Sequence, residues 1–308
     1  MKQYHIRTIP ISQRKTLVNI KDFAKLPPPS HSFNTFIDSL PDILVGSDFK
    51  ILVDAIVKSI RGKRLVGAGL GAHVIKCGLS PIIIDLMKRG VIKSVAMHGA
   101  TAIHDYEISL IGRTSENVSE GIKTGAFGMI SETSGAFVRA CRNAVSTNIG
   151  LGQSLGKLII KEHNKFVSAS ILANACKLGI PATVHVAIGT DTVHMHPSIS
   201  GADLGECSLT DFRIFANTIC GLNKGVWLNI GSAVIMPEVF LKAVSIARNL
   251  GHKLDSFTAA NLDMIQHYRP RQNVTGRPAP IGINITGHHE IMLPLLRMAI
   301  LSRLTNNK

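Results

Sequence analysis

The stretch RLVGAGLGAHVIKCGLSPIIIDLMKRGVIKSVAMHG, residues 64–99, decides the fold class. It opens with a short apolar run that ends in glycines, as a strand does when it leads into a loop. Ser80 and Pro81 then predict the start of a helix, and Gly90 predicts its end. The run Ser94–Met97 reads as a second strand, with His98 at its exit. This strand–helix–strand order favours a parallel pair of strands.

The second half of the chain continues the alternation. Apolar runs that lack a polar period predict buried strands at Ala182–Ile188, Val226–Ile230, Phe257–Leu262 and Ile281–Ile285. Helical patterns separate these runs, so we predict an α/β fold: a Rossmann-like parallel sheet with helices on both faces. Residues 46–308 form one predicted domain. Residues 1–45, with prolines at 27–29, form a predicted N-terminal arm.

Composition bounds the function. The chain has 308 residues, of which 18% are charged, and a net charge of +14, which suits an anionic ligand or a solvated surface. The basic residues are dispersed and aromatic residues are few, so no nucleic acid is expected as a partner. We find no run of 18 apolar residues and no signal peptide, and the five cysteines lack CxxC spacing. These features predict a cytoplasmic protein without a membrane partner.

Ligands of parallel α/β sheets bind beyond the carboxyl ends of the strands, where this sequence concentrates its glycine-rich and polar segments. Gly67-Ala-Gly-Leu-Gly71 indicates a close backbone approach to a phosphate or ribose, or else a simple tight turn. The spacing departs from GxGxxG, because the third glycine comes one residue early.

Histidines follow the next strand. His98 and His104 are candidate general bases, since an unperturbed imidazole titrates near neutrality. A helix-capping or ribose-bonding histidine is an equally valid interpretation. Asp105 is adjacent to His104, and on a helix the two side chains point about 100° apart.

Asp191, His194 and His196 form the densest group of candidate metal ligands. The glycine- and proline-bearing loop does not fix their directions. Hydrogen bonding to a polar substrate is therefore the favoured interpretation, and no metal is expected.

A basic loop lies between the last two predicted strands. It carries His267, Arg269, Arg271 and Arg277, and paired arginines suit a carboxylate or phosphate. Salt bridges to another subunit are the alternative. The segment His288-His289-Glu290 leaves the last strand and opens the last helix.

The residues from Gly67 to Leu110 resemble the NAD-binding half of deoxyhypusine synthase. Three later segments resemble the same family in the same order: Ser200-Gly-Ala-Asp-Leu-Gly-Glu206, Leu228-Asn-Ile-Gly-Ser-Ala-Val234 and His288–Leu296. The resemblance covers roughly residues 45–305. It implies a deoxyhypusine-synthase-like fold, NAD at the strand ends beside a subunit interface, and a homotetramer.

Site residues follow from this resemblance together with the strand ends. The cofactor contacts are expected at Gly69, Gly71, His73, Gly78, His98, Gly99, Ala100, His104, Asp105, Gly231 and Ser232. The substrate contacts are expected at Asp203, Glu206, Glu238, His267, Arg269, Arg271, Arg277, His289 and Glu290. The proton-transfer candidates are His98, His104 and His288.

One departure from the family changes the expected reaction. The family's catalytic lysine follows a Trp-Gly pair, whereas the corresponding residues 273–280 contain neither lysine nor tryptophan. Arg277 cannot replace the lysine, because a guanidinium stays protonated and forms no imine. We therefore expect an NAD-dependent enzyme that oxidises a small substrate or transfers a group from it, and the arginines of the basic loop favour an anionic substrate.

Three alternatives stay open. The first is true deoxyhypusine synthase activity with a displaced lysine such as Lys76. The second is a non-catalytic nucleotide-binding protein. The third is a metal-dependent hydrolase that uses His194 and His196.

Overall fold

The computed structural model describes residues 7–15 and 17–305. Its centre is a parallel sheet of six strands in the order β3-β2-β1-β4-β5-β6. The strands are β1 (Val66–Leu70), β2 (Ser94–His98), β3 (Ala182–His185), β4 (Val226–Ile230), β5 (Thr258–Asp263) and β6 (Ile281–Thr286). This is the strand order of doubly wound dinucleotide-binding folds, and the predicted fold class is confirmed. The order reverses between β1 and β4, which places a crevice at their carboxyl ends.

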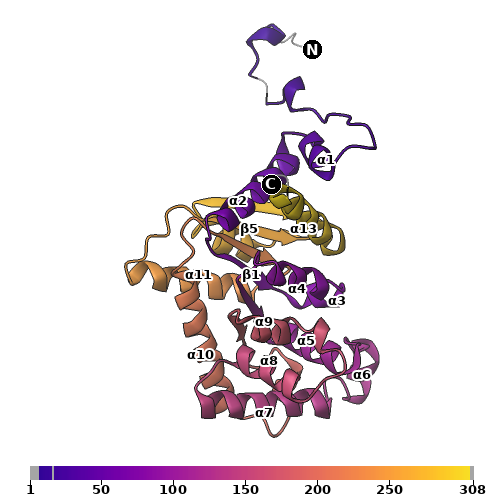
Figure 1. The fold of residues 1–308 in the computed structure, drawn as a ribbon, viewed down its shortest axis with the longest axis vertical. Helices are drawn as coiled ribbons and strands as arrows, with labels where there is room; N and C mark the ends of the chain where they lie inside the picture. The colour runs from indigo at the N-terminus through magenta and orange to yellow at the C-terminus, as the bar shows by residue number, and fades with distance from the viewer. Residues whose placement is uncertain (1–6, 16, 306–308) are drawn as a thin grey trace, which may run out of the picture.

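Helices cover both faces of the sheet (Figure 1). They are α1 (Phe33–Ser39), α2 (Leu44–Arg61), α3 (Ala72–Lys76), α4 (Ser80–Lys88), α5 (Gly99–Ile111), α6 (Val118–Thr124), α7 (Ser131–Thr147), α8 (Leu151–Lys161), α9 (Ile171–Leu178), α10 (Gly201–Ile219), α11 (Ile235–Asn249), α12 (Tyr268–Pro270) and α13 (His289–Thr305). A π-helical turn, Arg271–Gly276, follows α12, and a 3-10 turn, Thr192–Met195, follows β3. Among the described helices, none combines the length and the apolar character that a membrane crossing needs.

The core on the α10 and α11 face is built around Trp227 of β4. Its indole is fully buried and stacks on Phe240, with ring centroids 5.0 Å apart. A Cβ added at Gly67 or Gly69 would lie 2.9 or 2.8 Å from this indole. Both glycines lie inside β1 and make room for the tryptophan. Gly69 therefore serves packing, and not the cofactor contact that the sequence predicted.

Two buried aspartates hold neighbouring elements together. Asp105 of α5 accepts hydrogen bonds from the Ser170 hydroxyl and from the backbone N–H groups of Ile171 and Leu172, at the start of α9. Asp211 of α10 accepts from two further backbone N–H groups at the start of α8 and in β3. Burial raises the pKa of Asp105 to about 6 and that of Asp211 to about 7. Asp105 was predicted at the cofactor, but both of its oxygens hold α9 instead.

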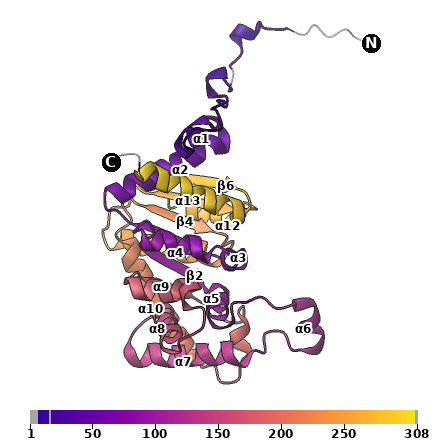
Figure 2. The same ribbon diagram turned by 45° about the vertical axis from the view of Figure 1, so that its right-hand side comes forward.

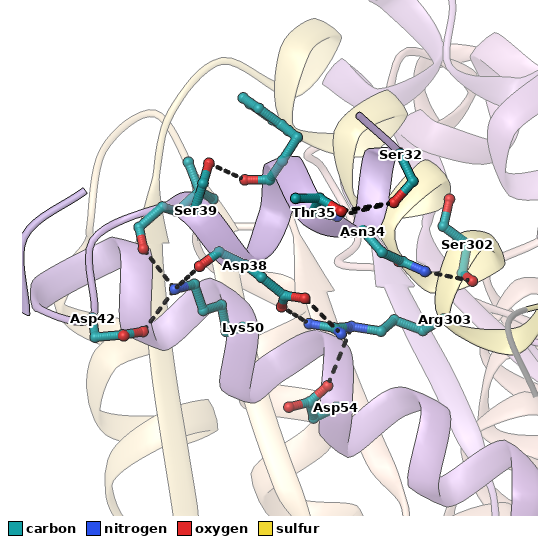
Figure 3. A network of polar contacts seen from close by, with 12 residues as sticks. Ser32, Asn34, Thr35, Asp38, Ser39, Asp42, Lys50, Asp54, Ser302 and Arg303 are labelled. Carbon is teal, nitrogen blue, oxygen red and sulfur yellow. Dashed lines mark hydrogen bonds and ion pairs between the residues drawn. The ribbon is translucent and has the colours of Figure 1, made fainter. Parts of the chain in front are cut away.

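Part of the predicted arm packs on the domain. Helix α1 lies against α13, where Asp38 pairs with Arg303 at 2.5 Å and the Asn34 amide donates to the Ser302 carbonyl (Figure 3). Lys50 of α2 donates to the Leu40 carbonyl at the end of α1. The described residues before α1 extend away from the body (Figure 1).

Candidate active site at the carboxyl edge of the sheet

The switch point between β1 and β4 is closely packed. The Gly71 N–H donates to the Ile230 carbonyl at 2.8 Å, and a Cβ at Gly71 would lie 1.9 Å from the Gly231 oxygen. Gly231 has a φ of +66°, which favours glycine. The Ser232 hydroxyl next to it accepts from the Met236 N–H at the start of α11. These glycines bring the exits of the two central strands together.

Two histidines flank this switch point. His289 is 1% exposed, and its Nε2 would lie 2.7 Å from a Cβ at Gly231. His73, exposed on α3, has its ring centroid 6.1 Å from that of His289. Asp263 Oδ1 lies 3.8 Å from His289 Nε2, whereas His289 Nδ1 is buried without a hydrogen-bond partner. Burial lowers the pKa of His289, so its imidazole is neutral near pH 7.

A cavity of about 230 Å³ lies beside the switch point, over β2 and β3. Helix α3 joins the two places, because His73 faces His289 and Lys76, one turn later, lines the cavity. The polar lining consists of Lys76, His104, Glu107, Ser115, Glu116, Thr190, Asp191 and Thr192. Three carboxyl groups and one lysine thus face the same space.

A chain of hydrogen bonds orients His104. Its Nδ1 lies 2.5 Å from Thr114 Oγ1, and that hydroxyl donates to Glu107 Oε2, also at 2.5 Å. Because the Thr114 proton goes to Glu107, Thr114 Oγ1 accepts from His104 and Nδ1 carries the proton. Nε2 then keeps its lone pair, so this ring can accept a proton from a ligand. Burial acts to raise the pKa of Glu107, but hydrogen bonds from His104 and Thr114 lower it overall.

Asp191 reaches the start of α5. A Cβ at Gly99 would lie 2.0 Å from its Oδ2, and its carboxylate accepts from the Ala100 N–H. Burial raises the pKa of Asp191 to about 6, although the hydrogen bond from Ala100 acts to lower it. His194 lies beside it, with Nε2 3.9 Å from Oδ2. His194 Nδ1 accepts the Gly189 N–H, which leaves the proton of a neutral ring on Nε2.

Other predicted histidines lie apart from this pair. His98 lies at the N-cap position of α5 without a capping hydrogen bond from its side chain, and burial, together with nearby His104, lowers its pKa to about 4. His98 is therefore neutral at pH 7. His196 accepts the Ser198 N–H and does not join Asp191 and His194. Within residues 7–15 and 17–305, no three His, Cys, Asp or Glu side chains are placed to hold a metal ion.

Two of the three arginines of the basic loop are engaged within the chain. Arg269 Nε lies 3.4 Å from Glu238, which also pairs with Lys242 and accepts from the Asn273 amide. Arg277 donates to Asn273 and to the Tyr268 hydroxyl. Arg271 and His267 are exposed, and neither side chain forms an ion pair among the described residues. Arg269 and Arg277 are thus held by groups of this chain itself, whereas Arg271 is not.

The remaining predicted residues are spread along the edge. Asp203 and Glu206 lie in the first turns of α10, where neither carboxylate has an ion-pair partner in the described part of the chain. Exposed His288 lies 3.8 Å from Glu290. Burial raises the pKa of the Cys77 thiol most, and Glu290, which contacts this thiol, raises it further. Gly78, with a φ of +73°, forms the turn after α3.

Residues that the sequence prediction missed complete the cavity. Glu107 lies three positions after His104 on α5, a spacing that places two side chains on one helix face. That spacing is the signal that could have found it. Thr114 and Glu116 lie on an irregular excursion between α5 and α7, for which no sequence period exists. This excursion carries α6 and projects from the body (Figure 2). It also borders a second, adjoining cavity of about 620 Å³, which shares Glu107, Ser115 and Glu116 with the first.

No protein-family model and no curated protein matches the sequence. Solved structures do match in fold. The ternary complex of AgrE with ornithine and NAD+ is 14% identical, with a TM-score of 0.55 over 85% of this chain and 34% of that chain. A conserved protein of Methanococcus maripaludis assigned as LOR/SDH is 16% identical, with a TM-score of 0.52 over 90% of this chain and 73% of that chain.

A protein of Entamoeba histolytica assigned as a deoxyhypusine synthase is 10% identical, with a TM-score of 0.53 over 89% of this chain and 94% of that chain. The chain therefore has a divergent deoxyhypusine-synthase-like fold, as the sequence predicted. It spans only about a third of the length of AgrE.

Proposed function

We propose that this protein is an NAD-dependent enzyme that acts on a small cationic amine. The observation that carries the proposal is the cavity over β2 and β3, where Glu107, Glu116 and Asp191 surround the proton-accepting His104. Carboxylates in a partly enclosed site attract a protonated amine. The similarity in fold to a complex of AgrE with ornithine and NAD+ supports NAD and an amine as the classes of ligand.

The switch point fits a dinucleotide. The strand order reverses here, which is where such folds bind their ligand, and the orphaned Nδ1 of buried His289 offers a polar contact. His73, Gly231, Ser232 and His289 are the residues that would hold the cofactor. NAD supplies a hydride acceptor for the carbon that bears the amine.

This chain's own residues do the rest. Asp191 and Glu116 bind the cationic amine, and His104 Nε2 takes up the proton released from the nitrogen. Glu107 stabilises the imidazolium through Thr114, at O–H···O and N···O distances of 2.5 Å. The excursion between α5 and α7, residues 112–130, limits the access of water to the cavity. One wall of the cavity is formed by Ser115, Glu116, Val118 and Phe127.

An anionic substrate at the basic loop is the weaker candidate. Arg269 is paired with Glu238, and Arg277 is bonded to Asn273, so binding an anion there would break existing contacts. The metal-dependent hydrolase has no supporting group of ligands among the described residues.

The proposal is tested by calorimetry with NAD, followed by an assay of NADH formation with a panel of diamines, polyamines and basic amino acids. His73→Glu places a negative charge at the switch point and is expected to weaken NAD binding about ten-fold or more. His104→Gln is expected to keep NAD binding and to lower turnover about 100-fold. NAD binding that stays unchanged in His73→Glu contradicts the assignment, as does turnover that survives His104→Gln. Tight NAD binding without turnover of any amine supports the non-catalytic alternative.

A second candidate reaction is transfer of the oxidised amine fragment through a lysine imine. Lys76 lines the same cavity as His104 and Asp191, which is the observation that favours it. Borohydride added during turnover reduces such an imine to a stable amine, so a mass increase is expected on Lys76. The Lys76→Arg variant is expected to show no such mass increase. NADH formation that persists in Lys76→Arg without any trapped adduct supports simple oxidation instead.

A further inference from the structure

A third cavity lies at the opposite, amino edge of the sheet. Its volume is about 820 Å³, and it is bordered by the end of α2 and by the starts of β5 and β6. The charged lining includes Lys58, Arg64 and Lys224. The proposed enzymatic function uses none of these residues, so this inference does not rest on it.

The three basic side chains lack partners among the residues that the structure describes. In the described part of the chain, Lys58, Arg64 and Lys224 form no side-chain hydrogen bond and no ion pair. Of the two acids in the lining, Asp54 already lies 3.8 Å from Arg303 Nε. Asp255 is the other acid. The cations therefore outnumber the acids that could neutralise them, which favours an anionic ligand.

Lys224 is held in place by its backbone. Its φ is +61°, a left-handed conformation in which a lysine costs about 1 kcal/mol relative to glycine. The Ser59 hydroxyl donates to its carbonyl at 3.1 Å, and a Cβ at the next residue, Gly225, would lie 2.2 Å from the Leu65 oxygen. The turn is thus fixed against α2 and β1. A glycine would suit this backbone better, so the lysine side chain serves something other than the turn.

One wall of the cavity is apolar. Ile51 is 48% exposed and Ile281 is 49% exposed, and Pro280 lies beside them. Large apolar side chains that line a cavity with a few charged groups are typical of sites for small organic ligands. The volume also falls in the range of such sites, roughly 300–1,000 Å³.

We infer that this cavity binds a phosphorylated small molecule with a flat ring, the chemical class of a nucleoside diphosphate. The phosphates contact Lys58, Arg64 and Lys224, and the ring lies on Ile51 and Ile281. Lysine and arginine are the usual phosphate-binding side chains, and a fixed backbone at Lys224 lowers the entropy that binding costs.

The test is calorimetric titration of the full chain with ADP, inorganic pyrophosphate and adenosine. Lys224→Gly removes the charge and keeps the left-handed turn. We expect it to weaken ADP binding about five- to ten-fold without loss of stability. Lys63→Gly is the matched control, because Lys63 has a φ of +55° and does not line the cavity. This control is expected to leave ADP binding unchanged.

Two further arms define the ligand and the place. ADP is expected to bind more tightly than pyrophosphate, and equal affinities would overturn the role of the ring. ADP binding is expected to be unaffected by His73→Glu at the carboxyl edge. Binding that falls in His73→Glu and stays intact in Lys224→Gly would overturn the proposed site, while leaving the proposed NAD site standing.

Discussion

Asp191, over β3, and Glu238, at the start of α11, lie at the same edge of the sheet in different surroundings. Asp191 is held by a neutral backbone N–H, and burial raises its pKa to about 6. Glu238 is held first by Lys242, with Arg269 and Asn273 nearby, and these groups lower its pKa. One carboxylate keeps an unneutralised charge beside a cavity, whereas the other is neutralised by its own chain.

The difference indicates which charged groups are available to a ligand. A buried carboxylate without a cation destabilises the fold when it ionises, so it favours binding of a cation from outside. A carboxylate in a surface ion-pair network gains little from a ligand. On this basis the amine is expected over β2 and β3, and an anion is not expected at the basic loop.

The largest effect is expected on turnover. Asp191→Asn removes the charge but keeps an oxygen that can accept the Ala100 N–H, and we expect kcat/KM for the amine to fall about 100-fold. Glu238→Gln is the matched control and is expected to change kcat/KM less than two-fold. Steady-state NADH formation measures both. Equal losses in the two variants would break the comparison.

The next effect concerns stability and pH. Because the pKa of Asp191 is raised from 3.8 to about 6, the folded state binds this proton more tightly than the unfolded state. Ionisation of Asp191 therefore destabilises the folded state, and this loss of stability develops as the pH rises from about 4 to 6. Asp191→Asn is expected to raise the free energy of unfolding by about 2 kcal/mol at pH 7 and to leave it unchanged at pH 4.

Denaturant unfolding at the two pH values checks this expectation. The pKa of Glu238 is lowered, so its charge contributes stability that is lost as the pH falls below its usual value. Glu238→Gln is expected to lower the free energy of unfolding at pH 7 by less than about 1 kcal/mol, because the group is partly exposed. A stabilised Glu238→Gln variant, or a gain for Asp191→Asn that persists at pH 4, would contradict the account.

The smallest effect is expected at the basic loop. Arg269→Gln breaks the contact with Glu238, and Arg277→Gln breaks the contact with Asn273. Neither change is expected to alter KM for the amine more than two-fold, as initial rates over a range of amine concentrations will show. A rise of ten-fold or more in either variant would place the substrate at the loop.

Most of the fold could be predicted from the sequence, because its strands are buried runs and its helices carry clear end signals. Gly90 lies just past α4 with a positive φ, as its position predicted. Ser80, which predicted the start of this helix, is the first residue of α4. Gly69 was misinterpreted because the group that needs its small size, Trp227, comes from another strand.

The site could be predicted only in part. His104, Gly71 and Gly231 were predicted at this edge because they follow strands, and strand exits meet at one edge. The lining of the cavity by Ser115 and Glu116 depends on an excursion without periodicity. The pairing of Arg269 with Glu238 depends on two elements that meet only in the folded chain. Such convergence is set by tertiary packing, which local patterns do not encode.

The central claim is that a cationic amine binds in the acid-lined cavity beside NAD. Calorimetric titration of the NAD-saturated protein with an amine from the turnover panel, at pH 7 and in parallel with Asp191→Asn, tests it most directly. The account predicts binding that the variant weakens about 100-fold while its NAD affinity is unchanged. Amine affinity that is equal in the two proteins would contradict it.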